Sequence, residues 1–79
     1  MEYEIDGETW LPWTDVQKKY GSKLTRQQLY IAAEKGLVRT RELQVDNTPY
    51  LYTVYAEADI IVGLAYNKFK LKVEVENLW

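Results

Sequence analysis

The chain has 79 residues, contains neither cysteine nor histidine, and carries a formal charge of −2 at pH 7. This length fits one domain, and the missing residue types exclude disulfide bonds, thiolate or imidazole metal ligands, and catalysis that depends on histidine. We therefore expect no enzyme, no cofactor and no small-molecule ligand. No apolar run is long enough to cross a membrane and no leader pattern opens the chain, so we expect a soluble intracellular protein without membrane contact.

Charge is distributed unevenly along the chain. Residues 1–13 carry −4, residues 14–45 carry +4, residues 46–67 carry −3, and residues 68–79 carry +1. Salt screens each charge beyond about 8–10 Å, so an acidic protein can still present a basic face to phosphates. The condition is that the basic block 14–45 folds onto one side of the molecule.

The first 13 residues predict a β-hairpin. Asp6 and Gly7 lie between two short strand-like runs, and this pair favours a two-residue type I′ turn. The turn sets the register of the strands and places Tyr3 opposite Trp10.

A short helix is predicted over residues 15–20. Thr14 and Gln17 form a capping box before it, and Gly21 is a typical helix end. Val16 and Tyr20 are four residues apart, so we expect both to face the core.

A second helix is predicted over residues 26–35. Thr25 and Gln28 form another capping box, and Leu24 packs on Leu29 as a hydrophobic staple. The helix ends at Gly36. Two capped helices joined by a short turn that contains glycine are typical of a helix-turn-helix.

The next segment predicts a hairpin followed by a third helix. Residues 37–45 and 50–55 are rich in strand-forming side chains and flank a turn-forming stretch that ends at Pro49. Apolar residues then follow helical spacing from Ala56 to about Asn67. Gly63 costs this helix about 1 kcal/mol relative to alanine.

Residues 68–76 alternate strictly between charged and apolar side chains, which predicts a half-buried strand. We expect this strand either to join the N-terminal hairpin or to leave an edge for a partner chain. Its apolar side consists of Phe69, Leu71, Val73 and Val75.

Residues 11–62 resemble the winged helix-turn-helix of phage excisionases and of the N-terminal domain of MerR-type regulators. The resemblance rests on Leu24-Thr25-Arg26-Gln27-Gln28-Leu29, on Glu34-Lys35-Gly36-Leu37-Val38, and on Tyr50-Leu51-Tyr52 followed by Glu57-Ala58-Asp59-Ile60. Tyr30 and Ile31 depart from the MerR-type pattern, which often has arginine and an aromatic residue at these positions. No long dimerisation helix or ligand-binding tail follows, so an excisionase is the closer match.

The resemblance implies an α+β fold with a single winged helix-turn-helix domain over residues 1–79. The N-terminal β-hairpin occupies residues 1–13, and the helix-turn-helix, the wing hairpin and the third helix occupy residues 14–67. Residues 68–79 form the C-terminal strand or a partner-binding tail. The implied function is that of an architectural or regulatory DNA-binding protein of a phage or mobile element, acting in the bacterial or host cytoplasm.

In a helix-turn-helix the second helix lies in the major groove with its N-terminal residues at the base edges. Arg26 can hold a guanine through two hydrogen bonds, Gln27 can hold an adenine in the same way, and Tyr30 also points outward. Basic residues of the first helix, the turn and the wing are candidates for phosphate or minor-groove contacts. They are Lys18, Lys19, Lys23, Arg39 and Arg41.

A second hypothesis is that the winged fold acts as an adaptor or inhibitor that binds a protein instead of DNA. The acidic flanks, the pI near 5.0 and the alternating C-terminal strand favour it, because strand addition gives affinity through main-chain bonds. For an excisionase, the resemblance implies that residues 68–79 contact a neighbouring copy on adjacent double-stranded DNA sites, or a recombinase. A carboxylate enzyme site at Glu57 and Asp59 is disfavoured, because residues two apart on a helix face different sides.

Overall fold

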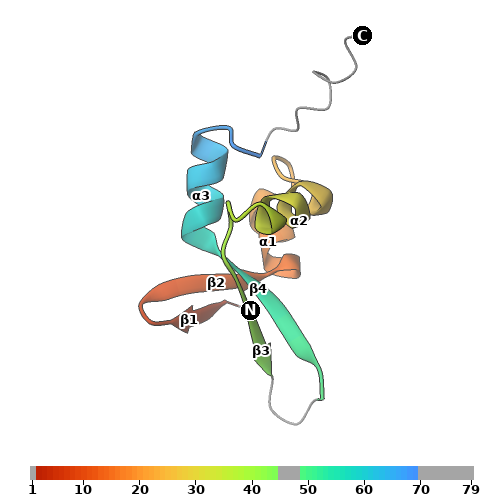
Figure 1. Cartoon of the computed structure of the whole chain (residues 1–79), viewed down its shortest axis with the longest axis vertical. Helices are drawn as coiled ribbons and strands as arrows, with labels where there is room; N and C mark the ends of the chain where they lie inside the picture. The colour runs from red at the N-terminus through yellow and green to blue at the C-terminus, as the bar shows by residue number, and fades with distance from the viewer. Residues whose placement is uncertain (1, 45–48, 70–79) are drawn as a thin grey trace.

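The structure is a computed structural model that describes residues 2–44 and 49–69. These residues form a small α+β fold with an antiparallel sheet of four strands in the order β1-β2-β4-β3. The three helices gather at one end of the sheet, and the β3–β4 hairpin extends away from them (Figure 1). The elements in chain order are β1 (Tyr3–Ile5), β2 (Glu8–Pro12), α1 (Trp13–Tyr20), α2 (Arg26–Glu34), β3 (Thr40–Gln44), β4 (Leu51–Ala56) and α3 (Glu57–Ala65).

The N-terminal hairpin has the predicted register. Tyr3 pairs with Trp10 across β1 and β2. Asp6 and Gly7 have φ values of 54° and 80°, and a type I′ turn requires positive φ at both central residues. The turn prediction is therefore confirmed.

Helix α1 begins two residues earlier than predicted. Pro12 is the N-cap residue, in an extended conformation, and no side chain caps this end of the helix. Thr14 lies inside the first turn, so the predicted capping box with Gln17 is wrong. The reason is that β2 leads directly into α1 at Pro12, whose fixed φ suits this junction. Val16 is buried as expected.

Helix α2 has the predicted capping box. The N–H group of Gln28 donates to Oγ1 of Thr25 over 3.1 Å, and the N–H group of Thr25 donates to Oε1 of Gln28 over 2.9 Å. The helix ends at Glu34, and Gly36 beyond it has a φ of 81° that suits glycine. This start fixes which side chains of α2 face solvent.

The sheet separates two apolar clusters. Trp10 and Leu11 are adjacent on β2 and point to opposite faces, as strand geometry requires. On the helical side, the buried residues are Leu11, Val16, Leu24, Leu29, Ala32, Val38, Ile60 and Phe69. On the other side they are Trp10, Val54 and Ala56.

The prediction of a strand over residues 68–76 is wrong for residues 68 and 69. Helix α3 ends at Ala65, and residues 66–69 form a turn in which the N–H group of Lys68 donates to the carbonyl of Gly63 over 2.7 Å. Phe69 is only 6% exposed and belongs to the core, so it is not available to a partner. The remaining predicted partner residues, Leu71, Val73 and Val75, lie outside the described residues, as do residues 46–48 of the wing turn.

Gly63 is the residue against which the Phe69 ring packs. A Cβ atom at position 63 would overlap that ring. The glycine that weakens α3 locally is therefore needed for the closure of the core. None of the helices in residues 2–44 and 49–69 has the length and the hydropathy that a membrane crossing requires.

We expect Gly63→Ala to destabilise the fold by about 1–2 kcal/mol, because overpacking against Phe69 outweighs the gain of about 1 kcal/mol in helix propensity. The measurement is urea denaturation followed by tryptophan fluorescence. As a control, the same substitution in a Phe69→Ala background should be neutral or stabilising, since the new methyl group then has room. A Gly63→Ala protein more stable than the wild type would contradict the packing assignment.

Candidate nucleic-acid interface

The solvent side of α2 carries the base-reading residues predicted from the sequence. Leu29 and Ala32 are buried, whereas Arg26, Gln27 and Tyr30 are exposed. Arg26 and Gln27 are the first two residues of the helix, so the capping box described above holds the backbone that carries them.

A shallow groove runs beside this side of α2. The helix contributes Tyr30, Ala33 and Glu34, and strands β3 and β4 contribute Thr40, Thr53 and Tyr55. Most of these side chains offer hydroxyl groups or apolar surface, and the only charged one is the Glu34 carboxylate. The predicted wing therefore borders α2 through a strip without positive charge.

Tyr30 is exposed but not free of local interactions. Its hydroxyl is hydrogen-bonded to Glu34 one turn further along α2, and this bond raises the pKa of Tyr30. The Glu34 charge is unfavourable for a phosphate at that position, so the basic end of this surface lies at the start of α2.

Arg39, which precedes β3, is held by two carboxylates from distant segments. Its guanidinium group contacts Glu8 of β2 over 2.6 and 3.0 Å, and its Nε donates to Asp59 of α3 over 2.8 Å. The N–H group of the Arg39 backbone also donates to Asp59, over 2.9 Å. We call Arg39, Glu8 and Asp59 the arginine clamp.

The arginine clamp changes the protonation of all three groups. The hydrogen bond from Arg39 lowers the pKa of Glu8, and the same donor lowers the pKa of Asp59. The pKa of Arg39 is raised, first by its hydrogen bond to Glu8 and then by that to Asp59. A phosphate would have to displace these carboxylates to reach the guanidinium group.

Arg41 lies on the sheet face that points away from the groove beside α2. It pairs in register with Val54, which belongs to the cluster around Trp10. The guanidinium groups of Arg39 and Arg41 lie 5.6 and 5.1 Å from the centroid of the Trp10 ring, respectively. Both arginines share one side of the wing, as predicted, but that side is not the one that α2 faces.

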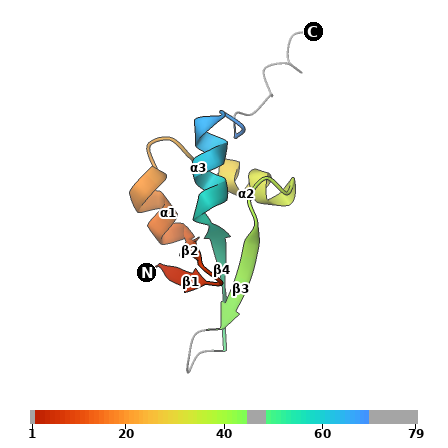
Figure 2. The same ribbon diagram turned by 90° about the vertical axis from the view of Figure 1, so that its left-hand side faces the viewer.

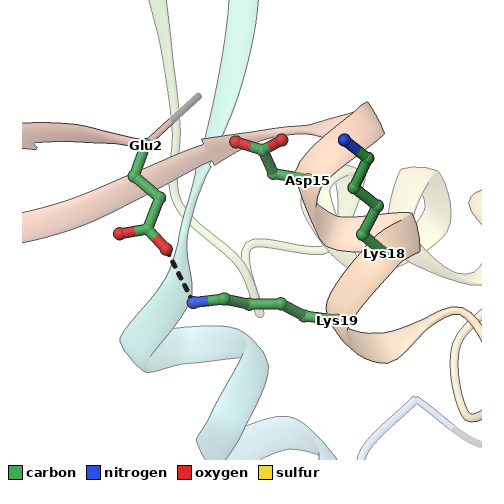
Figure 3. Close-up of a pocket in the computed structure, with 4 residues that line it drawn as sticks. All are labelled: Glu2, Asp15, Lys18 and Lys19. Atoms are coloured by element: carbon green, nitrogen blue, oxygen red, sulfur yellow. Dashed lines mark ion pairs between the residues drawn. The ribbon is translucent and has the colours of Figure 1, made fainter.

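The two lysines of α1, Lys18 and Lys19, differ in their contacts with carboxylates. Lys19 contacts Glu2 over 2.8 Å and Glu57 over 3.1 Å. Figure 3 shows Lys19 and Glu2 with Lys18, whose side chain points away from them along the same pocket. Tyr20 also donates to Glu57, over 2.7 Å. Partial burial and this bond raise the pKa of Tyr20 to about 12.

The structure thus separates seven of the eight predicted DNA-contacting residues into two groups, and the eighth, Lys18, is exposed on α1. The predicted residues on and just before α2 are exposed: Lys23, Arg26, Gln27 and Tyr30. Within residues 2–44 and 49–69, no carboxylate lies within ion-pair distance of Lys23 or Arg26. Lys19, Arg39 and Arg41 instead face acidic groups of the molecule, the last at 3.8 Å from Asp6. The sequence prediction of a single cationic patch is wrong for these three residues.

Sequence reasoning missed the partners of these cations. The sequence showed Glu8 only as part of an acidic segment, Asp59 as an acidic residue at the start of the third helix, and Trp10 as the strand residue opposite Tyr3. The one signal of these ion pairs in the sequence was that adjacent segments carry net charges of opposite sign. Their pairing depends on β2 and β4 being neighbours in the sheet, which places the first hairpin beside the wing.

Comparison with protein-family models, with curated proteins and with solved structures finds no match to this chain. Within residues 2–44 and 49–69, no group of three metal-binding side chains lies together. The site is therefore argued from its own geometry.

The arginine clamp predicts acid-sensitive stability. A carboxyl group whose pKa is lowered in the folded state stabilises above its unfolded pKa, and this contribution is lost as the pH falls through the folded value. We expect the free energy of unfolding to decrease as the pH drops below the ordinary values of 4.5 for Glu8 and 3.8 for Asp59. Urea denaturation at pH 7, 5, 4 and 3 measures it.

Asp59→Asn should lower stability at pH 7 and flatten this acid dependence, since one titrating partner of Arg39 is gone. Arg39→Gln removes the cation of the arginine clamp and should also flatten the dependence of the free energy of unfolding on pH. The double variant should lose less stability than the sum of the losses in the two single variants. Strictly additive losses would show that the two groups are not coupled.

Proposed function

We propose that this chain is a small excisionase-like protein that binds double-stranded DNA through α2, with β3 and β4 as the wing. The observation that carries the proposal is the start of α2. There a complete capping box holds Arg26 and Gln27 towards solvent, with Lys23 in the preceding turn and none of these residues paired with a carboxylate in the described part of the chain.

The chemistry of base reading supports this assignment. In the proposed complex the first turn of α2 enters the major groove, where Arg26 donates two hydrogen bonds to a guanine and Gln27 pairs with an adenine. Lys23 contacts the phosphates beside the groove. Arg39 and Arg41 have no part in this proposal, because both lie beside Trp10 on the side of the sheet away from α2, and Glu8 and Asp59 already hold Arg39.

The proposed site has few cations, so its dependence on salt should be moderate. Each neutralised phosphate contributes a slope of about −0.9 in a plot of log affinity against log salt concentration. We assign the phosphate contacts to Lys18, Lys23 and Lys35; the last is exposed directly after α2 and was not among the residues predicted from the sequence. Three contacts give an expected slope of about −3.

The test uses fluorescence anisotropy with a labelled duplex, enriched from a random-sequence pool by binding to the wild-type protein. Arg26→Ala should weaken binding to this duplex by about 5- to 150-fold, the value of one bidentate base contact. It should have a smaller effect on a scrambled duplex. Lys35→Ala removes the same charge from the other end of α2 and should weaken both duplexes equally.

Equal effects of Arg26→Ala and Lys35→Ala on both duplexes would refute base reading by α2. Absence of any binding by the wild-type protein at about 50 mM salt, where phosphate contacts are strong, would refute the DNA-binding function itself.

The second candidate, an adaptor that binds a protein, has one observation in its favour. Tyr50, Leu51 and Tyr52, at the start of β4, are 67%, 58% and 43% exposed, which is a large apolar surface for a chain of this size. This candidate predicts no duplex binding at low salt.

A further inference from the structure

Helix α3 has a solvent-exposed surface without charge. Ile61 and Val62 are 51% and 42% exposed, and Ala58 and Ala65 are exposed on the same side of the helix. Tyr66, directly after the helix, is 73% exposed. We call Ala58, Ile61, Val62 and Ala65 the α3 face. Contiguous exposed apolar surface often marks an interaction site.

The α3 face is open to approach. The core side of the helix consists of Ile60, Gly63 and the partly buried Leu64, so the α3 face points away from the rest of the molecule. Figure 2 looks from that side and shows α3 in front, with α1 and α2 on either side of it. Figure 1 shows α2 on the opposite side of the helical layer from α3. A partner on α3 would therefore leave the proposed DNA surface uncovered.

The α3 face has the same pattern of sizes in both directions along the helix. At 100° per residue, Ala58 and Ala65 lie above one another two turns apart, and Ile61 and Val62 lie between them on either side of that line. Reading from either end gives small, large, large, small. A twofold interface needs such a self-complementary surface, because each residue contacts the partner at the mirrored position.

We propose that the α3 face binds the α3 face of a second copy of this chain, with the two helices antiparallel. The twofold axis lies between the two helices at the level of residues 61 and 62. Ile61 therefore packs against Ile61 of the second copy on one side of the line through the alanines, and Val62 packs against Val62 on the other side. On that line, Ala58 faces Ala65 of the second copy. The small alanines on the centre line of the face permit a close approach of the two backbones, and the aliphatic side chains fill the space beside them.

Electrostatics favours the antiparallel arrangement over a parallel one. Antiparallel alignment places the positive end of each helix dipole beside the negative end of the other, and it places Lys68, which follows the end of α3, beside the first turn of α3 in the second copy. The carboxylates of that turn are already engaged within the chain, Glu57 with Lys19 and Asp59 with Arg39, so the helix dipoles carry this preference. A parallel pair would place the like ends of the two dipoles together.

The interface is small. A nine-residue helix covers much less than the roughly 800 Å² per partner of a standard stable interface, so the isolated dimer should be weak. We expect a dissociation constant of about 0.1–1 mM. This inference does not depend on the proposed function, since it is tested without DNA.

The first measurement is sedimentation equilibrium of the full chain at concentrations up to about 1 mM, the upper end of the expected dissociation constant. We expect the wild-type protein to form a dimer and Ile61→Lys to weaken it at least 10-fold. The matched control is Leu51→Lys, which places the same charge at another exposed aliphatic residue, on β4, and should leave dimerisation unchanged. A strictly monomeric wild-type protein, as expected if residues 70–79 or another protein cover the α3 face, would overturn the proposal.

The second measurement tests the orientation by disulfide cross-linking, because the natural chain has no cysteine. In an antiparallel pair, the thiol of an Ala58→Cys copy meets the thiol of an Ala65→Cys copy. Identical positions lie about 10 Å apart along the axis, beyond disulfide reach. A mixture of the two variants, one of them labelled with ¹⁵N so that mass distinguishes the two, should give mainly the mixed dimer. Mainly like-with-like dimers, or the random proportion of mixed and like dimers, would refute the antiparallel arrangement.

Discussion

The arginine clamp connects three parts of the chain that are distant in sequence. Arg39 stands just before β3, Glu8 in the first hairpin and Asp59 at the start of α3. The guanidinium group also lies beside Trp10, which closes the smaller of the two apolar clusters. Such contacts between partly exposed groups are individually modest, but a shared arginine orders several partners at once. The clamp therefore joins β2, β3 and α3 at the surface, beside the apolar clusters that pack these elements together.

The same contacts decide the distribution of charge on the surface. The acidic β1–β2 hairpin lies beside the β3–β4 hairpin, where Glu8 pairs with Arg39 and Asp6 lies 3.8 Å from Arg41. Glu2 and Glu57 pair with Lys19. The cations at the start of α2 have no such neighbours in the described residues. The proposed DNA surface is consequently smaller than the basic segment of the sequence, and it is centred on one helix end.

The proposed roles of α2 and α3 are compatible because the two helices occupy different sides of the helical layer. Two copies joined through α3 would each keep an exposed α2. A weak contact between copies becomes effective when both are held on neighbouring sites, because the local concentration is then high. The interaction surface between copies was expected in residues 68–79 from the sequence, whereas the α3 face now has the stronger structural argument.

Local features were predictable from the sequence. The Asp6-Gly7 turn, the capping box at Thr25 and the glycine turn at Gly36 just after α2 depend on the conformational preferences of a few adjacent residues, and all three are present. The boundary of α1 was mispredicted because Thr14 also fits inside a helix, and only the direct junction with β2 decides between the two possibilities. The burial of Phe69 was missed because strict alternation is typical of a strand, and the space beside Gly63 is a property of the folded core.

The sequence by itself determined the elements and the exposed start of α2, since turn, cap and periodicity preferences act over a few residues. Only the tertiary structure decided which charges are neutralised, on which side of the wing Arg41 lies, and that α3 keeps an uncharged face in solvent. Those outcomes depend on the order β1-β2-β4-β3, which brings residues about thirty or more positions apart within hydrogen-bond distance. No local pattern specifies such pairings, because each charged residue had several oppositely charged candidates along the chain.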